Sequence, residues 1–421
     1  MREEALKLRS LFVIAGTCLV VATGAYAAVV AATPPGEPTI PGVEYAVGGI
    51  GAKPLPTTGA PRHLTGAGIG QLGGALQAAA TKAGTAAGKA AGTGKLPALK
   101  VGFVDIIGGI ESADRVDNAW RNAFQHLGAK WLYCDGAGNP SKWATCGTSL
   151  LSQGANVLTM NGIDPTTIPQ VMKAAARKHV PIISCCGAAT PGFAVNFAPD
   201  EKSGATILAK WLQAKVKGRS GVQKIVAIDY PATWATSRTK VLKALVASDP
   251  HLQVIATAVT DPTNLVEGTR KIVDDELTAH PDVAIFWASF DTVGQVVGQE
   301  VAAKFPGKSW PEKPLVATFH ADPSTLPLLK SGAINGVVDY NYDVNAWESV
   351  DAFVQNRIHG TAYPPFAKTN AGIASYPGIG NPLYYPMVVG ANVPPAGQYV
   401  RPKVDAVSYF IAKWKAEGIG K

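Results

Sequence analysis

Residues 99–127 read LKVGFVDIIGGIESADRVDNAWRNAFQHL, an apolar run followed by a stretch in which apolar residues recur every three or four positions. The run from Leu99 to Ile106 is rich in β-branched residues and predicts a buried strand. The stretch from Ala113 to Leu127 predicts a helix that turns Val116 and Phe124 inward. A strand followed by an amphipathic helix is the repeating unit of an α/β protein.

The same alternation continues along the chain to residue 319. Further strands are predicted at Lys130–Cys134, Val157–Met160, Ile182–Cys185, Lys224–Asp229, Val254–Val259, Val283–Trp287 and Leu315–Phe319. Helices are predicted between them at Pro140–Gln153, Thr166–His179, Glu201–Lys217, Ser237–Ala247, Leu265–Ala279 and Thr292–Lys304. Because βαβ units form parallel sheets with right-handed crossovers, two such series predict two doubly wound, Rossmann-like lobes.

The first 27 residues have the pattern of a signal peptide. A polar start with Arg2 and Lys7 precedes the apolar run Leu11–Val21, and Ala25-Tyr26-Ala27 has the small-x-small form of a cleavage site. We expect cleavage before Ala28, although the apolar stretch continues far enough that an uncleaved membrane anchor stays open. The mature protein is therefore expected outside the cytoplasm, in the periplasm or at the cell surface or beyond.

Composition changes on both sides of the regular region. Residues 28–97 are rich in Gly, Ala, Pro and Thr, with few large apolar side chains, and predict a flexible tether. Residues 361–421 form a C-terminal extension, in which Asp405–Lys415 has the period of one terminal helix.

The cysteines fit an oxidising compartment, where disulfides persist. Of the five, Cys134 and Cys146 are the favoured pair, because the bridge would tie a strand end to the next helix. Cys185 and Cys186 are adjacent, and a vicinal disulfide and two reduced thiols both stay open. No C-x-x-C pair or interleaved histidine occurs, so neither a zinc site nor a redox motif is predicted.

Charge and motifs argue against two other classes of function. The net charge of +8 is spread along helices beside acidic residues, with no basic run, so nucleic-acid binding is not predicted. The chain has no G-x-S-x-G elbow, P-loop or H-E-x-x-H motif, so no enzyme, cofactor or metal is predicted. A hydrolase built by geometry alone stays open as an alternative.

Several segments together resemble a known family. They are DGAGNPSK at 135–142, LSQGANV at 151–157, VPII at 180–183 and HPDVAIF at 280–286. Over roughly Leu99 to Arg357 the chain resembles the periplasmic sugar-binding proteins of the ribose-binding type. These are solute-binding proteins of ABC transporters with the type 1 periplasmic-binding-protein fold.

The resemblance implies two lobes joined by a multi-strand hinge, with crossovers near Phe197–Asp200 and Asp339–Asp343. The N-terminal lobe would comprise 98–199 plus 340–360, and the C-terminal lobe 200–339. It further implies a monomer that binds a small solute, a sugar or polyol, and delivers it to a membrane ABC permease. A receptor for a membrane signalling partner, and a solute that is an amine, a carboxylate or an aromatic compound, stay open as alternatives.

Ligands of such folds lie beyond the carboxyl ends of the strands. The candidate ligand-binding residues are Asp105, Glu111, Ser112, Cys186, Trp234, Arg238, Asp291, His320 and Tyr340. Arg238 and Asp291 match family positions and could hold hydroxyl groups, and Trp234 could stack on an apolar face of the solute. His320 could donate to a ligand or titrate near neutral pH. The family's sugar clamp is incomplete, because Cys186-Gly187 replaces its Asp-Arg pair and the first loop, Ile106–Ser112, lacks aromatic residues.

Overall fold

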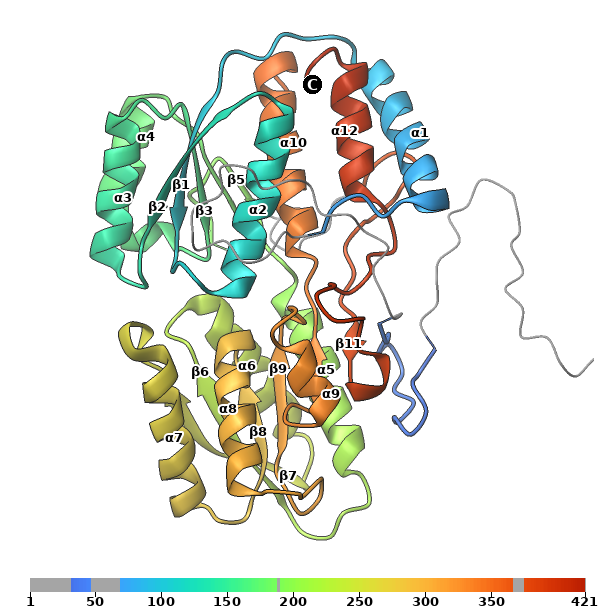
Figure 1. Ribbon diagram of the computed structural model, residues 1–421. Helices are drawn as coiled ribbons and strands as arrows, with labels where there is room; N and C mark the ends of the chain where they lie inside the picture. Colours follow the sequence, from blue (N-terminus) through green and yellow to red (C-terminus); the bar gives the residue numbers. More distant parts are fainter. Residues whose placement is uncertain (1–31, 47–68, 188–189, 366–374, 421) are drawn as a thin grey trace, which may run out of the picture.

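The structure is a computed structural model that describes residues 32–46, 69–187, 190–365 and 375–420. Two lobes lie one above the other, each a twisted sheet with helices on both faces (Figure 1). The predicted signal peptide and its cleavage site lie outside the described residues. Within these ranges, no helix has the length and apolar character needed to cross a membrane.

The first lobe contains five parallel strands in the order β2-β1-β3-β4-β5. Its strands are β1 (Lys100–Asp105), β2 (Lys130–Asp135), β3 (Val157–Asn161), β4 (Ile182–Cys185) and β5 (Val195–Phe197). Its helices are α2 (Glu111–His126), α3 (Pro140–Ser152), η1 (Pro165–Thr167), α4 (Pro169–Arg177) and α10 (Tyr342–His359). α2 and α10 pack together, and α3 packs with α4 (Figure 1). Asn139 begins α3 as its side chain accepts the N–H of Ser141 at 2.9 Å.

The second lobe contains six strands in the order β11-β10-β9-β8-β6-β7. Its strands are β6 (Gln223–Asp229), β7 (Leu252–Val259), β8 (Val283–Ala288), β9 (Leu315–Phe319), β10 (Gly336–Val338) and β11 (Met387–Val388). Its helices are α5 (Glu201–Val216), α6 (Thr233–Val246), η2 (Pro262–Asn264), α7 (Leu265–Ala279), α8 (Asp291–Lys304), α9 (Leu326–Ser331) and η3 (Gly390–Asn392). Only the pairing of β11 with β10 is antiparallel among the described strand pairs of this sheet. The predicted α/β class with two doubly wound lobes is confirmed.

The chain crosses between the lobes twice. It leaves the first sheet after β5 and enters α5 through residues 198–200, and it returns after β10 through 339–341 to begin α10. The crossovers expected from the sequence cover the same residues. Each crossover segment directly follows a short strand, β5 in the first lobe and β10 in the second. The hinge therefore consists of residues 198–200 and 339–341.

A buried cluster of charges lies at the hinge, and we call it the Arg115 cluster. Arg115, on α2 of the first lobe, donates to Asp322 (3.2 Å), which follows β9 of the second. It also donates to Asp339 (3.2 Å) and Asp343 (2.7 Å) in the hinge. All four side chains are buried. One guanidinium therefore joins both lobes and the hinge.

The predicted flexible tether is wrong for residues 74–91, which form helix α1 (Gly74–Ala91). α1 packs along the terminal helix α12 (Ala406–Ala416), and the terminal helix expected near these residues is confirmed (Figure 1). A Cβ added at Gly84 or Gly88 would lie 2.1 or 2.2 Å from a carbonyl oxygen of α12. The small residues that suggested weak packing thus allow two helix backbones to approach closely.

A second part of the predicted tether, residues 44–46, is also ordered. Tyr45 is buried and forms a parallel bridge with Met387. The N–H of Met387 donates to Glu44 and the N–H of Ala46 donates to Met387, at 2.8 and 2.9 Å. Residues near both ends of the chain therefore extend the edge of the second sheet.

Candidate ligand-binding cleft

A cavity lies between the lobes, where loops follow the carboxyl ends of strands from both sheets, as expected for this fold. The empty space, with the solvent at its mouth, is about 500 Å³, which falls in the range of small-molecule sites. The first lobe contributes Ile106, Ile107, Ile110, Ser112, Ala113, Val116, Asn161, Gly162 and Cys186. The second lobe and the hinge contribute Tyr230, Trp234, Phe290, His320 and Tyr342.

Three aromatic residues form one wall of the cavity. The ring of Tyr230 stacks on Trp234, with centroids 5.5 Å apart, and the ring of Phe290 meets both edge to face at 5.4 and 5.7 Å. Tyr230 and Phe290 come one and two positions after β6 and β8, so the end of the sheet fixes their positions. We call these three residues the aromatic wall. Its flat, apolar surface suits a ring-shaped ligand.

A chain of hydrogen bonds runs along the floor of the cavity, and we call it the polar chain. Ser112 Oγ donates to Asp291 Oδ1 at 3.0 Å, and His320 Nδ1 lies 3.0 Å from the same oxygen. The Tyr342 hydroxyl lies 2.6 Å from His320 Nε2 and accepts from Arg238 Nη2 at 3.0 Å. These contacts join the first lobe, the second lobe and the hinge.

The polar chain has one consistent direction of donation. Burial lowers the pKa of His320, although Asp291 opposes this shift, so the ring is neutral near pH 7. A neutral ring has one N–H, and Asp291 can only accept when ionised. The Nδ1–H therefore donates to Asp291, and Nε2 accepts the Tyr342 hydroxyl. His320 acts here as a fixed structural link between neighbouring side chains.

Arg238 lies behind the aromatic wall and is not among the residues of the described chain that line the cavity. Its guanidinium donates twice to Glu201, at 2.5 and 3.0 Å, and once to the Ser289 carbonyl at 2.6 Å. It also lies 5.1 Å from the centroid of the Trp234 ring. The expectation that Arg238 clamps a solute is corrected, because these partners hold the guanidinium away from the cavity. Trp234, in contrast, lies in the cavity as predicted.

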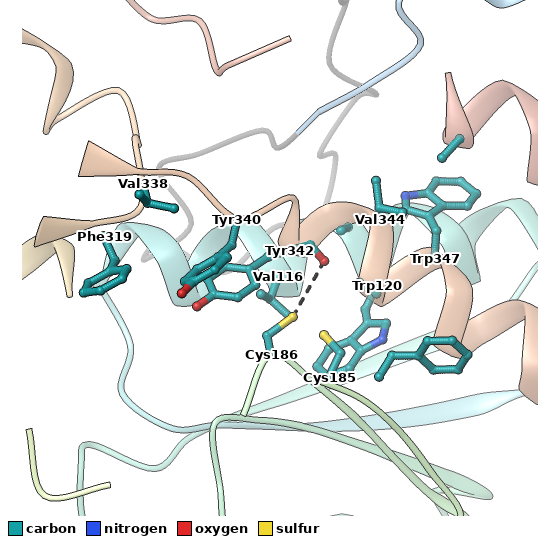
Figure 2. Packing of buried hydrophobic residues seen from close by; sticks show 14 of the residues in the cluster. Val116, Trp120, Cys185, Cys186, Phe319, Val338, Tyr340, Tyr342, Val344 and Trp347 are labelled. Atoms are coloured by element: carbon teal, nitrogen blue, oxygen red, sulfur yellow. Dashed lines mark hydrogen bonds between the residues drawn. The ribbon is translucent and has the colours of Figure 1, made fainter. Parts of the chain in front are cut away.

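Asp105 and Tyr340 also lie outside the cavity lining. Asp105 accepts the Tyr133 hydroxyl at 3.0 Å, and burial raises the pKa of Asp105 to about 6. The ring of Tyr340 stacks on Phe319 with centroids 5.9 Å apart (Figure 2). Both side chains are fully buried, so packing behind the cavity, rather than ligand contact, explains their positions.

Two candidate residues connect the lobes across the cavity. Glu111, at the start of α2, accepts the backbone N–H of Ser324 at 2.9 Å and also the Ser324 hydroxyl. Ser112 contributes its bond to Asp291, which begins α8. These contacts connect α2 of the first lobe to two loops of the second.

The predicted pairing of Cys134 and Cys146 is confirmed as a disulfide that ties β2 to α3. Cys185 and Cys186 are free and buried. Cys186 lines the cavity, and its Sγ contacts the carbonyl oxygen of Tyr342 at 3.7 Å (Figure 2). Its backbone φ of 63° is unusual for a residue with a side chain. This conformation aims the thiol at the hinge.

Asp291, His320 and Asp322 are the one group of described residues with ligand atoms close enough to hold a metal, all within 4.8 Å. Both ring nitrogens of His320 already belong to the polar chain. Asp322 already binds Arg115. These hydrogen bonds and the ion pair with Arg115 therefore explain why the three side chains lie close together.

Sequence comparison identifies the family. A model of the periplasmic binding protein domain matches residues 101–357, which is more than half of the chain. The chain belongs to this family. The resemblance stated from the sequence is confirmed. No curated protein matches the sequence.

Solved periplasmic binding proteins share the fold at low sequence identity. An ABC transporter solute-binding protein from Mycobacterium smegmatis with bound glycerol has a TM-score of 0.57 and 20% identity, over 70% of this chain and 96% of its own. A carbohydrate-transporter solute-binding protein from Agrobacterium radiobacter with D-arabinose has a TM-score of 0.55 and 20% identity, over 71% and 96%. The Caulobacter myo-inositol-binding protein has a TM-score of 0.56 and 18% identity, over 64% and 91%.

Sequence reasoning missed several lining residues of this periplasmic binding protein. Tyr230 and Phe290 stand one and two positions after strands, at the sheet edge where ligands bind, and that position could have indicated them. Asn161, the last residue of β3, carries the same indication, whereas Tyr342 gave none. Asn161 accepts the N–H of Ile106, so its place depends on the fold of the first loop.

Proposed function

We propose that this protein is an exported solute-binding protein that closes its two lobes around a small ligand of the size of a sugar or polyol. It would then deliver that ligand to a membrane ABC permease. The observation that carries this proposal is a cavity lined by both lobes and crossed by the Ser112–Asp291 hydrogen bond. The bound glycerol, D-arabinose and myo-inositol of the similar structures support the size of the ligand.

Binding without catalysis is supported by the order of the polar chain. Ser112, His320 and Asp291 are the residue types of a hydrolytic triad, in which the histidine contacts the serine hydroxyl. Here the serine hydroxyl donates to Asp291, and His320 Nε2 faces Tyr342 instead. His320 therefore does not accept the proton of this serine as the histidine of a triad does, and this argues against the alternative of a hydrolase.

Closure would follow from contacts that both lobes share. A ligand shifts the equilibrium between open and closed forms only by its greater affinity for the closed form. The bonds of Glu111 to Ser324 and of Ser112 to Asp291 form only when the lobes approach each other. These bonds add to the free energy by which the ligand favours the closed form. A permease or a signalling partner would recognise the surface of that closed form.

The test is ligand binding with lobe closure as the readout. The mature chain is screened by thermal shift against sugars, polyols, amines, carboxylates and aromatic compounds, because a ligand of the native state raises the Tm. A true ligand should also reduce the radius of gyration in small-angle scattering. Ser112→Ala should weaken its binding by about 10- to 100-fold, because a hydrogen bond to a charged group contributes about 1.5–3 kcal/mol.

Ser152→Ala is the matched control. The Ser152 hydroxyl bonds only within its own helix, to Thr148, and lies away from the cavity. It should leave affinity unchanged. Turnover of a bound compound, or binding with no change in the radius of gyration, would contradict the proposed function.

A further inference from the structure

We infer that the solute is an uncharged ring compound with one broad apolar face and one or two oxygen atoms that accept hydrogen bonds. The inference rests on the proposed function. Among ligands of the size given in the proposed function, it selects cyclic alcohols, ethers and ketones with few oxygen atoms over polyhydroxylated sugars and polyols.

The first step concerns charge. In the described part of the chain, no Asp, Glu, Lys or Arg side chain lines the cavity. Arg238 is bound to Glu201, and Asp291 accepts from Ser112 and His320. A charged solute would lose its hydrating water on entering the cavity and would meet no counter-charge on the cavity lining. This transfer costs free energy in a buried site. The solute is therefore neutral.

The second step concerns the groups that a polyhydroxylated ring would need. The backbone N–H groups of Ile106, Ile107 and Gly108 in the first loop already donate to Asn161, Asp105 and Asp135. The polar chain likewise pairs the side chains of the floor with one another. Each ligand hydroxyl that enters without a partner lowers affinity by roughly 10-fold or more.

The third step identifies the unpaired polar side-chain groups among the described residues that line the cavity, which do not include Asp291. The Tyr230 hydroxyl and the Trp234 Nε1–H are buried, and neither has a hydrogen-bond partner among the described residues. Tyr230 is only 3% exposed, and burial raises its pKa to about 12, so it keeps its proton. Both groups are donors on the aromatic wall. They call for one or two acceptor oxygens on the ligand.

The remaining surface is apolar. Ile106, Ile107, Ile110 and Val116 line the cavity from the first lobe, together with the aromatic wall from the second. A ring with a continuous face of CH groups would fill this space and displace water from it. The broad apolar face of the solute follows from these side chains.

The experiment uses one ring with different substituents. Isothermal titration of the mature full chain compares cyclohexanone and cyclohexanol with myo-inositol, cyclohexylamine and cyclohexanecarboxylate; D-arabinose and glycerol complete the set. The ketone or the alcohol should bind at least about 10-fold more tightly than each of the others, in line with the loss expected for each unpaired hydroxyl.

Two variants test the donors. Tyr230→Phe and Trp234→Phe keep an aromatic ring and remove one donor, and each should weaken binding of the ketone by about 3- to 10-fold. Tyr363→Phe and Trp310→Phe make the same changes outside the cavity and should leave affinity unchanged.

The outcomes separate this inference from the proposed function. Tighter binding of myo-inositol, D-arabinose or glycerol with lobe closure would overturn the inference and leave the proposed function standing. Tighter binding of the amine or the carboxylate would overturn the inference in the same way. If no compound of this set or of the wider screen binds, both proposals fail.

Discussion

Replacing Arg115 with methionine should destabilise the protein more than any change of one surface charge. The substitution keeps much of the side-chain volume and leaves Asp322, Asp339 and Asp343 without their cation. Because all of these groups are buried, the loss is about 3–5 kcal/mol, the range found when one partner of a buried ion pair is removed.

The loss should also depend on pH. Burial raises the pKa of Asp322 and Asp343 in the folded protein, and Arg115 opposes this shift. Removing Arg115 raises both pKa values further. A carboxyl group with a raised folded pKa stabilises the folded state below its unfolded pKa of about 3.9 and loses that contribution as the pH rises through the folded value. The penalty of Arg115→Met should therefore be larger at pH 7.5 than at pH 5.

Guanidinium unfolding followed by tryptophan fluorescence at both pH values measures this effect. A pKa that rises by a further 1 in the folded protein corresponds to about 1.4 kcal/mol of stability. Arg270→Met is the matched control, because Arg270 is 43% exposed and pairs with Glu267 and Glu300 at the surface, where a pair contributes about 0–1 kcal/mol. A loss below about 1 kcal/mol for Arg115→Met, or an equal loss at both pH values, would refute the reasoning.

Three further predictions concern packing, the disulfide and His320. Gly204→Ala should lower the free energy of unfolding by denaturant by about 1–3 kcal/mol, because the added Cβ would lie 2.1 Å from the Tyr340 hydroxyl. The control Gly268→Ala, on α7, meets nothing within 4 Å and should be neutral or stabilising. Equal effects of the two substitutions would contradict this prediction. Cys134→Ser opens the disulfide, whose cysteines are 12 positions apart, and should cost about 2–3 kcal/mol; a Tm unchanged from the oxidised parent would contradict it. Burial lowers the pKa of His320 in the folded protein, so this residue contributes stability that is complete above its unfolded pKa of about 6.5 and is lost as the pH falls through the folded pKa. His320→Gln should therefore reduce the decrease in Tm on acidification. An unchanged dependence of Tm on pH would argue against this prediction.

Most of the fold could be predicted from the sequence because the strands are short apolar runs between amphipathic helices. β1 to β4 and β6 to β9 lie where apolar periodicity places them. β5, β10 and β11 were missed, since strands of three, three and two residues carry no periodicity. α1 was missed for a different reason: its 18 residues contain few large apolar side chains, and its packing depends on Gly84 and Gly88 meeting a helix far away in the sequence.

The candidate site was predicted in part. Position after a strand led to Trp234 and His320, and both side chains line the cavity. The same reasoning led to Arg238 and Asp105, yet a charged group at a strand end can be bound by a partner that the sequence does not reveal. Glu201 is 37 positions from Arg238, and Tyr133 is 28 positions from Asp105. Only the packing of the lobes decides whether such a charge is available to a ligand.

The packing of α1 against α12 constrains the order in which parts of the fold can form. The two helices stand near opposite ends of the chain, and β11 also joins its sheet late in the sequence. Helix α1 can pair with α12 only after residue 416 has been synthesised, and β11 can join its sheet only after residue 388, since contacts so distant in sequence form late. These two contacts therefore complete a fold whose other strands are already available for pairing.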